Sequence, residues 1–128
     1  MTDFTIHTID TAPERARAGL RAAQQKLGFI PNMMAVLAES PVALEGYQAV
    51  QGALATSSLS TAEQHFLALA ISVDNGCTYC VPAYSMMAAK SGTPQQAVDA
   101  VRDGQPIDDG RLSALRDFTR AVVEKRGR

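Results

Sequence analysis

Apolar residues recur at helical spacing along almost the whole chain of 128 residues, and this pattern constrains the fold most. Gly, Pro and Ser stand where the apolar stretches end, as is typical of helix ends and turns. No alternating run of β-branched residues reaches the length of a strand. The sequence therefore predicts an all-α fold, a single-domain helical bundle over residues 1–128.

The expected helices follow from local start and stop residues. Asp10 or Thr11 is expected to cap the first helix, with Pro13 in its first turn. Ser60 and Glu63 have the spacing of a capping box. The expected helices cover residues 10–27, 33–38, 40–56, 60–74, 77–90, 93–102 and 110–125.

Composition and charge exclude several classes of protein. Apolar residues make up 46% of the chain, which supports a packed core rather than disorder. The formal net charge is only -1, so neither nucleic acid nor an anionic membrane is an expected partner. No apolar run approaches the roughly 20 residues of a membrane helix. The first residues lack the pattern of a secretory signal, and we expect a cytoplasmic protein.

The two cysteines of the chain both lie in one CxxC motif. Cys77 and Cys80 occur in the run Asn-Gly-Cys-Thr-Tyr-Cys of residues 75–80. Two thiols at this spacing can close a disulfide and open it again, and the start of a helix favours the thiolate that such chemistry needs. In a cytoplasmic protein, a CxxC is more often catalytic or metal-binding than a structural crosslink.

Several interpretations of this CxxC compete. A zinc site needs three or four protein ligands, but there is no second CxxC, and His7 and His65 are the only histidines. We therefore expect no metal and no cofactor. A thioredoxin fold would place the motif after a strand, and no convincing strand is present. Two buried cysteines that act only as small apolar residues are a further possibility. A redox pair in an all-α frame is the favoured interpretation.

Two segments carry a resemblance to a known family. Residues 59–65, Leu-Ser-Thr-Ala-Glu-Gln-His, and residues 75–84, Asn-Gly-Cys-Thr-Tyr-Cys-Val-Pro-Ala-Tyr, resemble the core of the carboxymuconolactone decarboxylase superfamily in its alkylhydroperoxidase D-like branch. Residues 27–32, Leu-Gly-Phe-Ile-Pro-Asn, are similar to the upstream segment of its peroxidase-related members. The resemblance implies an all-α fold and assembly as a trimer or hexamer.

The resemblance also implies roles for individual residues. The family pattern is Glu-x11-Cys-x2-Cys-x3-His, in which the second cysteine attacks peroxide and the first resolves the disulfide. Carried over, Cys80 is peroxidatic and Cys77 is resolving. The relay positions hold His65 in place of Glu and Tyr84 in place of His. Glu63 is no simple replacement, because two helical steps turn its side chain by about 200° from that of His65.

We therefore interpret the proton relay of the family pattern as rebuilt from His65 and Tyr84. An imidazole titrates near neutral pH, so His65 is the predicted base. A tyrosine hydroxyl is a poor base at neutral pH, so Tyr84 is predicted to orient or to donate a proton. The plainer interpretation is a core histidine bonded to a carbonyl and a tyrosine that only packs.

The predicted function is that of a thiol-dependent (alkyl)hydroperoxide reductase. The expected partners are a hydroperoxide and a thiol or dithiol reductant, either a protein or a lipoyl-type donor. The first alternative is a non-catalytic redox sensor or assembly module that has lost the usual relay. The second is the lactone chemistry of the other branch of the superfamily, which generally lacks the CxxC.

The length of the chain bears on its assembly. Related peroxidase-like chains usually continue with more helix than this one, so either this variant is short or C-terminal helices seen in relatives are not represented. Apolar faces left uncovered by those helices would be covered by neighbouring copies. We therefore expect a homo-oligomer.

Overall fold

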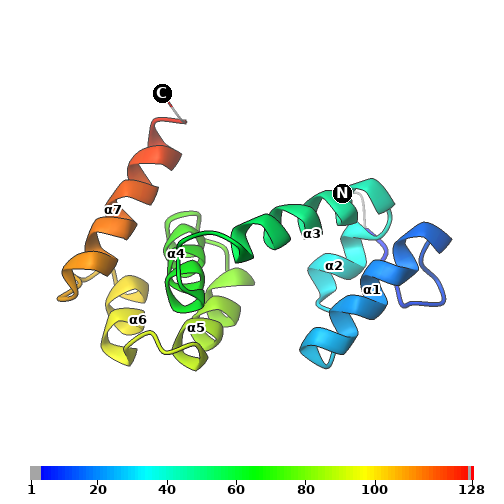
Figure 1. Cartoon of the computed structure of the whole chain (residues 1–128), viewed down its shortest axis with the longest axis horizontal. Coiled ribbons are helices and arrows are strands. Elements are labelled where there is room, and N and C mark those ends of the chain that lie inside the picture. The colour runs from blue at the N-terminus through cyan, green and yellow to red at the C-terminus, as the bar shows by residue number, and fades with distance from the viewer. Residues whose placement is uncertain (1–3, 127) are drawn as a thin grey trace. The chain divides into compact units, whose positions relative to one another are not determined.

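The computed structural model describes residues 4–126 and 128, and the elements found in them are seven α-helices (Figure 1). The helices are α1 (Glu14–Leu27), α2 (Asn32–Leu37), α3 (Pro41–Ala55), α4 (Thr61–Asp74), α5 (Cys80–Lys90), α6 (Gln95–Arg102) and α7 (Gly110–Glu124). Over this described part the prediction of an all-α fold is confirmed. No described helix combines the length and the hydropathy needed to span a membrane.

The packing contacts divide the chain into two compact units. The first unit ends at Thr56 and the second begins at Ser57. Helices α1, α2 and α3 pack within the first unit, and helices α4 to α7 pack within the second. The sequence-based view of residues 1–128 as one domain stays a prediction.

The first unit is held together by a close approach of α1 and α3. A side chain at Gly19 would collide with Gln48, whose amide nitrogen instead donates a hydrogen bond to the Gly19 carbonyl oxygen over 3.0 Å. Arg15 donates two hydrogen bonds to the Glu45 carboxylate, over 2.7 and 2.6 Å. The buried core is built mainly from small and aliphatic side chains, namely Ala12, Ala16, Leu20, Ala23, Met34, Ala38 and Leu44.

The predicted cap of the first helix is wrong. The residue before α1 is Pro13, and no side chain caps this helix. Thr11 is engaged elsewhere, because its hydroxyl accepts a hydrogen bond from the Thr8 backbone N–H over 2.9 Å. The polar residues before α1 therefore form a local turn, and the fixed φ angle of proline starts the helix without a side-chain acceptor.

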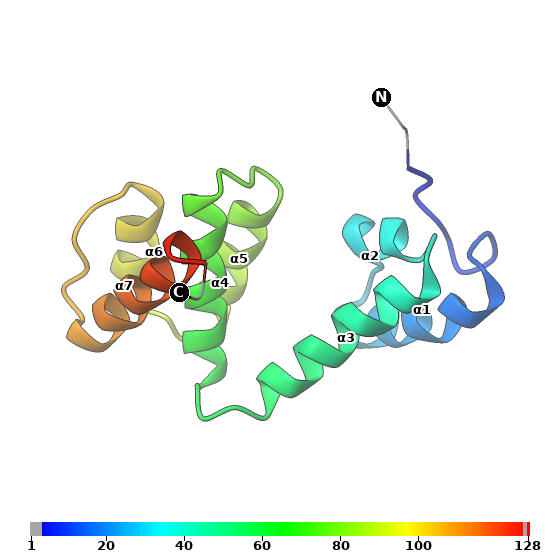
Figure 2. The ribbon, with the colours of Figure 1, turned by 90° about the horizontal axis from the view of Figure 1, so that it is seen from above.

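In the second unit, α4 is the central helix. It packs against α5, α6 and α7, with α5 on one side and α7 on the other (Figures 1 and 2). Phe66 and Leu69 of α4 are fully buried, and they share one core with Ala88 of α5 and Val98 of α6. Burial of these side chains is the main stabilising term for the unit.

Both ends of α4 are fixed by polar contacts, as its sequence predicts for the first turn. The Ser60 hydroxyl accepts from the Glu63 backbone N–H, and the Glu63 carboxylate accepts from the Ser60 N–H, so the predicted capping box is confirmed. Glu63 also pairs with Arg111 in the first turn of α7. Asp74 at the end of α4 pairs with Arg120 further along α7. The two ion pairs therefore align α4 and α7 in the same direction.

The pair of Glu63 and Arg111 predicts a loss of stability in acid. The Arg111 guanidinium, followed by the backbone and hydroxyl of Ser60, lowers the pKa of Glu63 from 4.5 to about 2. A carboxyl whose pKa is lower in the folded than in the unfolded chain stabilises the fold above pH 4.5, and this contribution disappears as the pH falls from 4.5 to about 2. Glu63→Gln should therefore flatten the decline in the free energy of unfolding over this window. Urea denaturation at several pH values measures the slope.

The control for this experiment is Glu124→Gln, at the exposed end of α7. This variant should keep the wild-type slope. Equal flattening in both variants would contradict the assignment of the acid sensitivity to Glu63.

Candidate active site

The turn after α4 determines where Cys77 lies. The Gly76 N–H donates to the Val73 carbonyl oxygen over 3.0 Å, and the Cys77 N–H donates to the Ser72 carbonyl oxygen over 2.9 Å. This pair of bonds is a Schellman motif, which needs a left-handed residue after the helix. Gly76 supplies that conformation, with a φ of 63°. The motif therefore ties the backbone of Cys77 directly to the last turn of α4.

The same residue also begins the next helix. The Cys77 carbonyl oxygen accepts from the backbone N–H groups of Cys80 and Val81, over 3.1 and 3.0 Å. The expected helix start at residue 77 is wrong, because α5 begins at Cys80. The glycine turn needs three further residues before the chain can enter the helix. Cys77 thus lies in the turn, and Cys80 is the first residue of α5.

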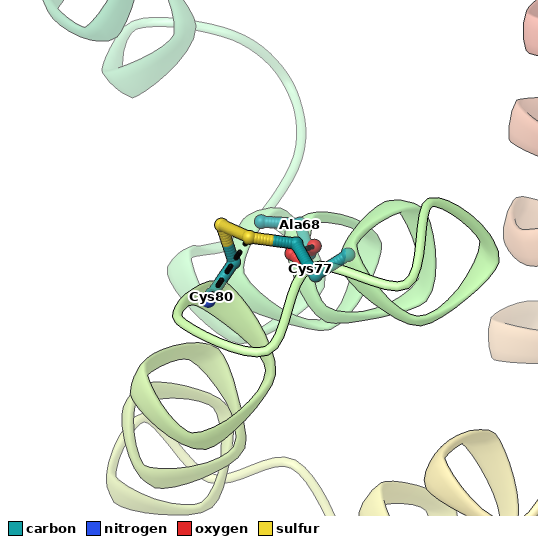
Figure 3. The surroundings of a disulfide bond; sticks show 4 residues. Ala68, Cys77 and Cys80 are labelled. Atoms are coloured by element: carbon teal, nitrogen blue, oxygen red, sulfur yellow. Dashed lines mark hydrogen bonds between the residues drawn. A yellow bond between two sulfur atoms is a disulfide. The ribbon is translucent and has the colours of Figure 1, made fainter. Parts of the chain in front are cut away.

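The two cysteine sulfurs are bonded to each other across this turn (Figure 3). Their Cα atoms are 5.3 Å apart, within the usual range for a disulfide. The Cys80 backbone N–H donates to the Cys77 sulfur over 3.1 Å. Both residues are half-buried, so neither is fully shut off from solvent. In the reduced state, this N–H would stabilise negative charge on Cys77.

Tyr84 lies one helical turn after Cys80 on α5. Residues four apart lie on the same face of a helix, so the phenol ring and the Cys80 side chain share a face. The ring packs against the core of the second unit. Tyr84 is only half-buried, and no hydrogen bond joins its hydroxyl to any residue in the described part of the chain. The hydroxyl therefore remains available to a bound molecule.

His65 lies elsewhere. The Ser91 hydroxyl, at the end of α5, donates to the Met87 carbonyl oxygen over 2.7 Å, so His65 Nδ1 donates to Ser91 Oγ over 2.9 Å. Ser91 and Cys80 mark opposite ends of α5, a separation of about 16 Å along the helix axis. Within this chain, the hydrogen bonding of His65 therefore places it with the far end of α5 and not with the sulfurs.

Sequence reasoning missed Ser72, which supports the turn from inside α4. It is one of the buried polar residues, and its hydroxyl donates to the Ala68 carbonyl oxygen over 2.6 Å. Its own carbonyl oxygen is the acceptor for Cys77. A serine in the last turn of a largely apolar helix was the available signal, because a buried hydroxyl there must find an acceptor on its own helix.

The arrangement suits thiol chemistry. Among the described residues, no group of three or more His, Cys, Asp or Glu side chains is placed to hold a metal ion. What the site presents is a half-buried disulfide, a backbone N–H directed at one sulfur, and a tyrosine on the same helix face as the other cysteine. A disulfide of this kind can accept two electrons and return as two thiols.

The chain is similar to known proteins in its family and its fold. The sequence model of the carboxymuconolactone decarboxylase family matches residues 41–121. A search of the curated proteins finds no match. Among solved structures, an uncharacterized peroxidase-related protein from Silicibacter sp. TM1040 superposes with a TM-score of 0.75 and is 25% identical in sequence. The similarity covers 96% of this chain and 68% of that one.

The position of His65 leads to a prediction that separates a structural from a catalytic role. His65→Ala should leave the alkylation rate of the reduced thiols at neutral pH unchanged, because the imidazole is bonded at the other end of α5. It should lower the free energy of unfolding by about 1 kcal/mol, the usual contribution of one hydrogen bond. Stopped-flow alkylation and urea denaturation measure the two effects.

Ser91→Ala is the matched variant, since it removes the other partner of the same bond. The double variant should lose little more stability than either single one. A marked slowing of alkylation in His65→Ala alone would instead restore the sequence-based role of His65 as a base.

Proposed function

This chain belongs to the carboxymuconolactone decarboxylase family, and we propose that it is a thiol-dependent hydroperoxide reductase that uses Cys77 and Cys80. One observation carries the proposal: these cysteines form a half-buried disulfide where the turn after α4 enters α5. The peroxidase-related structural neighbour supports the same class of reaction.

The proposed reaction is a two-electron reduction of the O–O bond. The Cys80 thiolate attacks the terminal oxygen of a hydroperoxide and becomes a sulfenic acid, while the alkoxide leaves and takes up a proton. The Cys77 thiolate then attacks the Cys80 sulfur, which forms the disulfide and releases water. Over the cycle, two thiols become one disulfide, and one hydroperoxide becomes an alcohol and water.

The hydrogen bond at Cys77 supports its role as the resolving residue. A resolving cysteine must itself be a thiolate when it attacks the sulfenic acid. The Cys80 N–H lies 3.1 Å from the Cys77 sulfur, and it would hold the negative charge on that sulfur until the attack. Because the Schellman turn fixes the Cys77 backbone, the attack needs little chain movement.

Tyr84 is the proposed proton donor to the leaving alkoxide. It is four residues after Cys80 on α5, and its hydroxyl has no partner among the described residues. An alkoxide is a much stronger base than a phenolate, so the proton transfer is favourable. The phenolate recovers its proton from water. His65 takes no part in this scheme, because it is bonded to Ser91.

A dithiol would complete the cycle. Its thiolate attacks one sulfur of the Cys77–Cys80 disulfide, and its second thiol then closes the donor's own disulfide and releases both protein thiols. A dithiol protein or a lipoyl-type donor has this chemistry. The half-buried disulfide leaves room for such an attack.

A second candidate function is that of a redox sensor without turnover. The observation that favours it is the bond of His65 to Ser91, since His65 then does not replace the missing glutamate of the family pattern. The lactone chemistry in the family's name is a third candidate, and it would not need the thiols. Thiols that oxidise once but consume no further hydroperoxide would identify the sensor.

We also propose that the protein self-associates. Exposed apolar side chains lie close together on α7, where Phe118 is 69% exposed and Val122 and Val123 are each 45% exposed. Residues 118 and 122 are one helical turn apart and form a continuous apolar face. A second copy of the chain is the proposed occupant, in keeping with the assembly that the resemblance implies.

Single-cysteine variants test which sulfur is attacked first. Cys77→Ser retains the peroxidatic residue, so one equivalent of hydroperoxide should convert Cys80 to a sulfenic acid. Cys80→Ser should form no sulfenic acid under the same conditions, and both variants should lose turnover. Mass spectrometry after dimedone trapping measures the adduct. Trapping at Cys77 in Cys80→Ser would reverse the assigned order.

The role of Tyr84 is tested by removing only its hydroxyl. Tyr84→Phe keeps the ring and its packing, so stability should hold while kcat/KM for an alkyl hydroperoxide falls by about 10²-fold. Tyr79→Phe is the control, because Tyr79 stands between the two cysteines in the sequence and is 51% exposed. An undiminished rate in Tyr84→Phe, or an equal loss in both variants, would remove Tyr84 from the mechanism.

A further inference from the structure

A second site lies on the other side of α4, where this helix faces α6 and α7. There the structure has an open pocket of about 230 Å³. Its polar lining includes Asp74 of α4 and Arg116 and Arg120 of α7. None of the redox residues contributes to its wall. The pocket is therefore separate from the site of the proposed thiol chemistry.

The Arg116 guanidinium is the unusual feature of this pocket. The side chain is only 16% exposed, although a buried charge normally needs a strong partner. Its Nε donates to the Asp117 carboxylate over 3.2 Å, and Asp117 is 62% exposed. Its Nη1 donates to the Gln105 carbonyl oxygen over 3.3 Å. The carboxylate that pairs with Arg116 is therefore itself mostly in solvent, which weakens its compensation of the guanidinium charge.

Arg116 also has N–H groups that no residue in the described part of the chain accepts. Among the described residues, Nη2 of Arg116 has no hydrogen-bond partner. Every side-chain nitrogen or oxygen that is shut off from solvent in this part of the chain does have a partner. Nη2 is therefore not enclosed. Because Arg116 lines the pocket, this nitrogen offers two N–H donors to a molecule bound there.

Arg120 adds charge to the same wall. It lies four residues after Arg116, on the same face of α7, and donates two hydrogen bonds to Asp74 over 3.1 and 2.6 Å. This bidentate pair satisfies the one carboxylate in the lining. The lining itself holds two guanidinium groups and one carboxylate, while Asp117, the partner of Arg116, lies outside it. The N–H donors of Arg116 that no described residue accepts are therefore the feature that favours an anion.

The rest of the wall limits the chemistry of that anion. Ala70, Val101 and Pro106 supply apolar surface beside the two arginines. A carboxylate matches the fork of a guanidinium group, and a short carbon chain matches the apolar side. We propose that this pocket binds a small organic carboxylate, with Arg116 as its principal partner.

Titration followed by ¹⁵N–¹H NMR on the full chain tests the proposal. Butyrate is the probe, 1-butanol is the uncharged ligand of equal chain length, and inorganic phosphate is the anion without a chain. Butyrate should give saturable shifts that centre on Gly104, Gln105 and Arg116, while 1-butanol should give none. Saturable binding of phosphate but not of butyrate would overturn the carboxylate assignment.

Variants locate the site. Arg116→Gln should weaken butyrate binding by about tenfold or more, because it removes the charge and the fork. Arg102→Gln, at the exposed end of α6 and outside the pocket, should bind as the wild type does. Thermal unfolding shows whether each variant is folded. Equal binding by Arg116→Gln and the wild type, or no saturable butyrate shift at all, would overturn the proposal.

Discussion

The Schellman turn at the end of α4 is the constraint on which the candidate site depends. Its two hydrogen bonds fix Gly76 and Cys77 to the last turn of the helix, and only a residue that tolerates a positive φ can stand at position 76. The carbonyl of Cys77 then accepts the first hydrogen bonds of α5. One residue thus ends one helix and starts the next, which sets the distance between Cys77 and Cys80.

Helix α4 contributes to both candidate sites, because different helices cover its two sides. On the side of α5, the turn holds the sulfurs, and the buried hydroxyl of Ser72 supports that turn. On the side of α7, the pair of Asp74 and Arg120 forms one wall of the pocket that Arg116 also lines. Because Asp74 lies three residues before Cys77, both candidate sites are at the C-terminal end of α4.

Local signals in the sequence predicted the helices well. The capping box at Ser60 and the helix end at residue 74 depend on hydrogen bonds between near neighbours, so the residues themselves carry the information. The failure at Thr11 has a local cause too, since a competing turn with Thr8 takes its hydroxyl. The start of α5 was placed too early because a Schellman turn adds residues that periodicity does not reveal.

The sites were harder to predict because they depend on how helices align. The CxxC favours a redox pair over the other interpretations, and the structure joins its two sulfurs in a disulfide. The role given to His65 came from its position along the sequence. In the antiparallel pair of α4 and α5, however, His65 meets Ser91, at the end of α5 opposite Cys80. The pocket at Arg116 forms where the segment between α6 and α7 lies near α4. No local sequence pattern predicts that arrangement.

The central claim is that Cys77 and Cys80 exchange two electrons with a hydroperoxide inside a helical unit. The most direct measurement adds limiting cumene hydroperoxide to the reduced protein and counts free thiols, cumyl alcohol and remaining peroxide. The account predicts that each peroxide consumed yields one alcohol and removes two thiols, and that a dithiol restores both. Peroxide that persists beside two free thiols would contradict it.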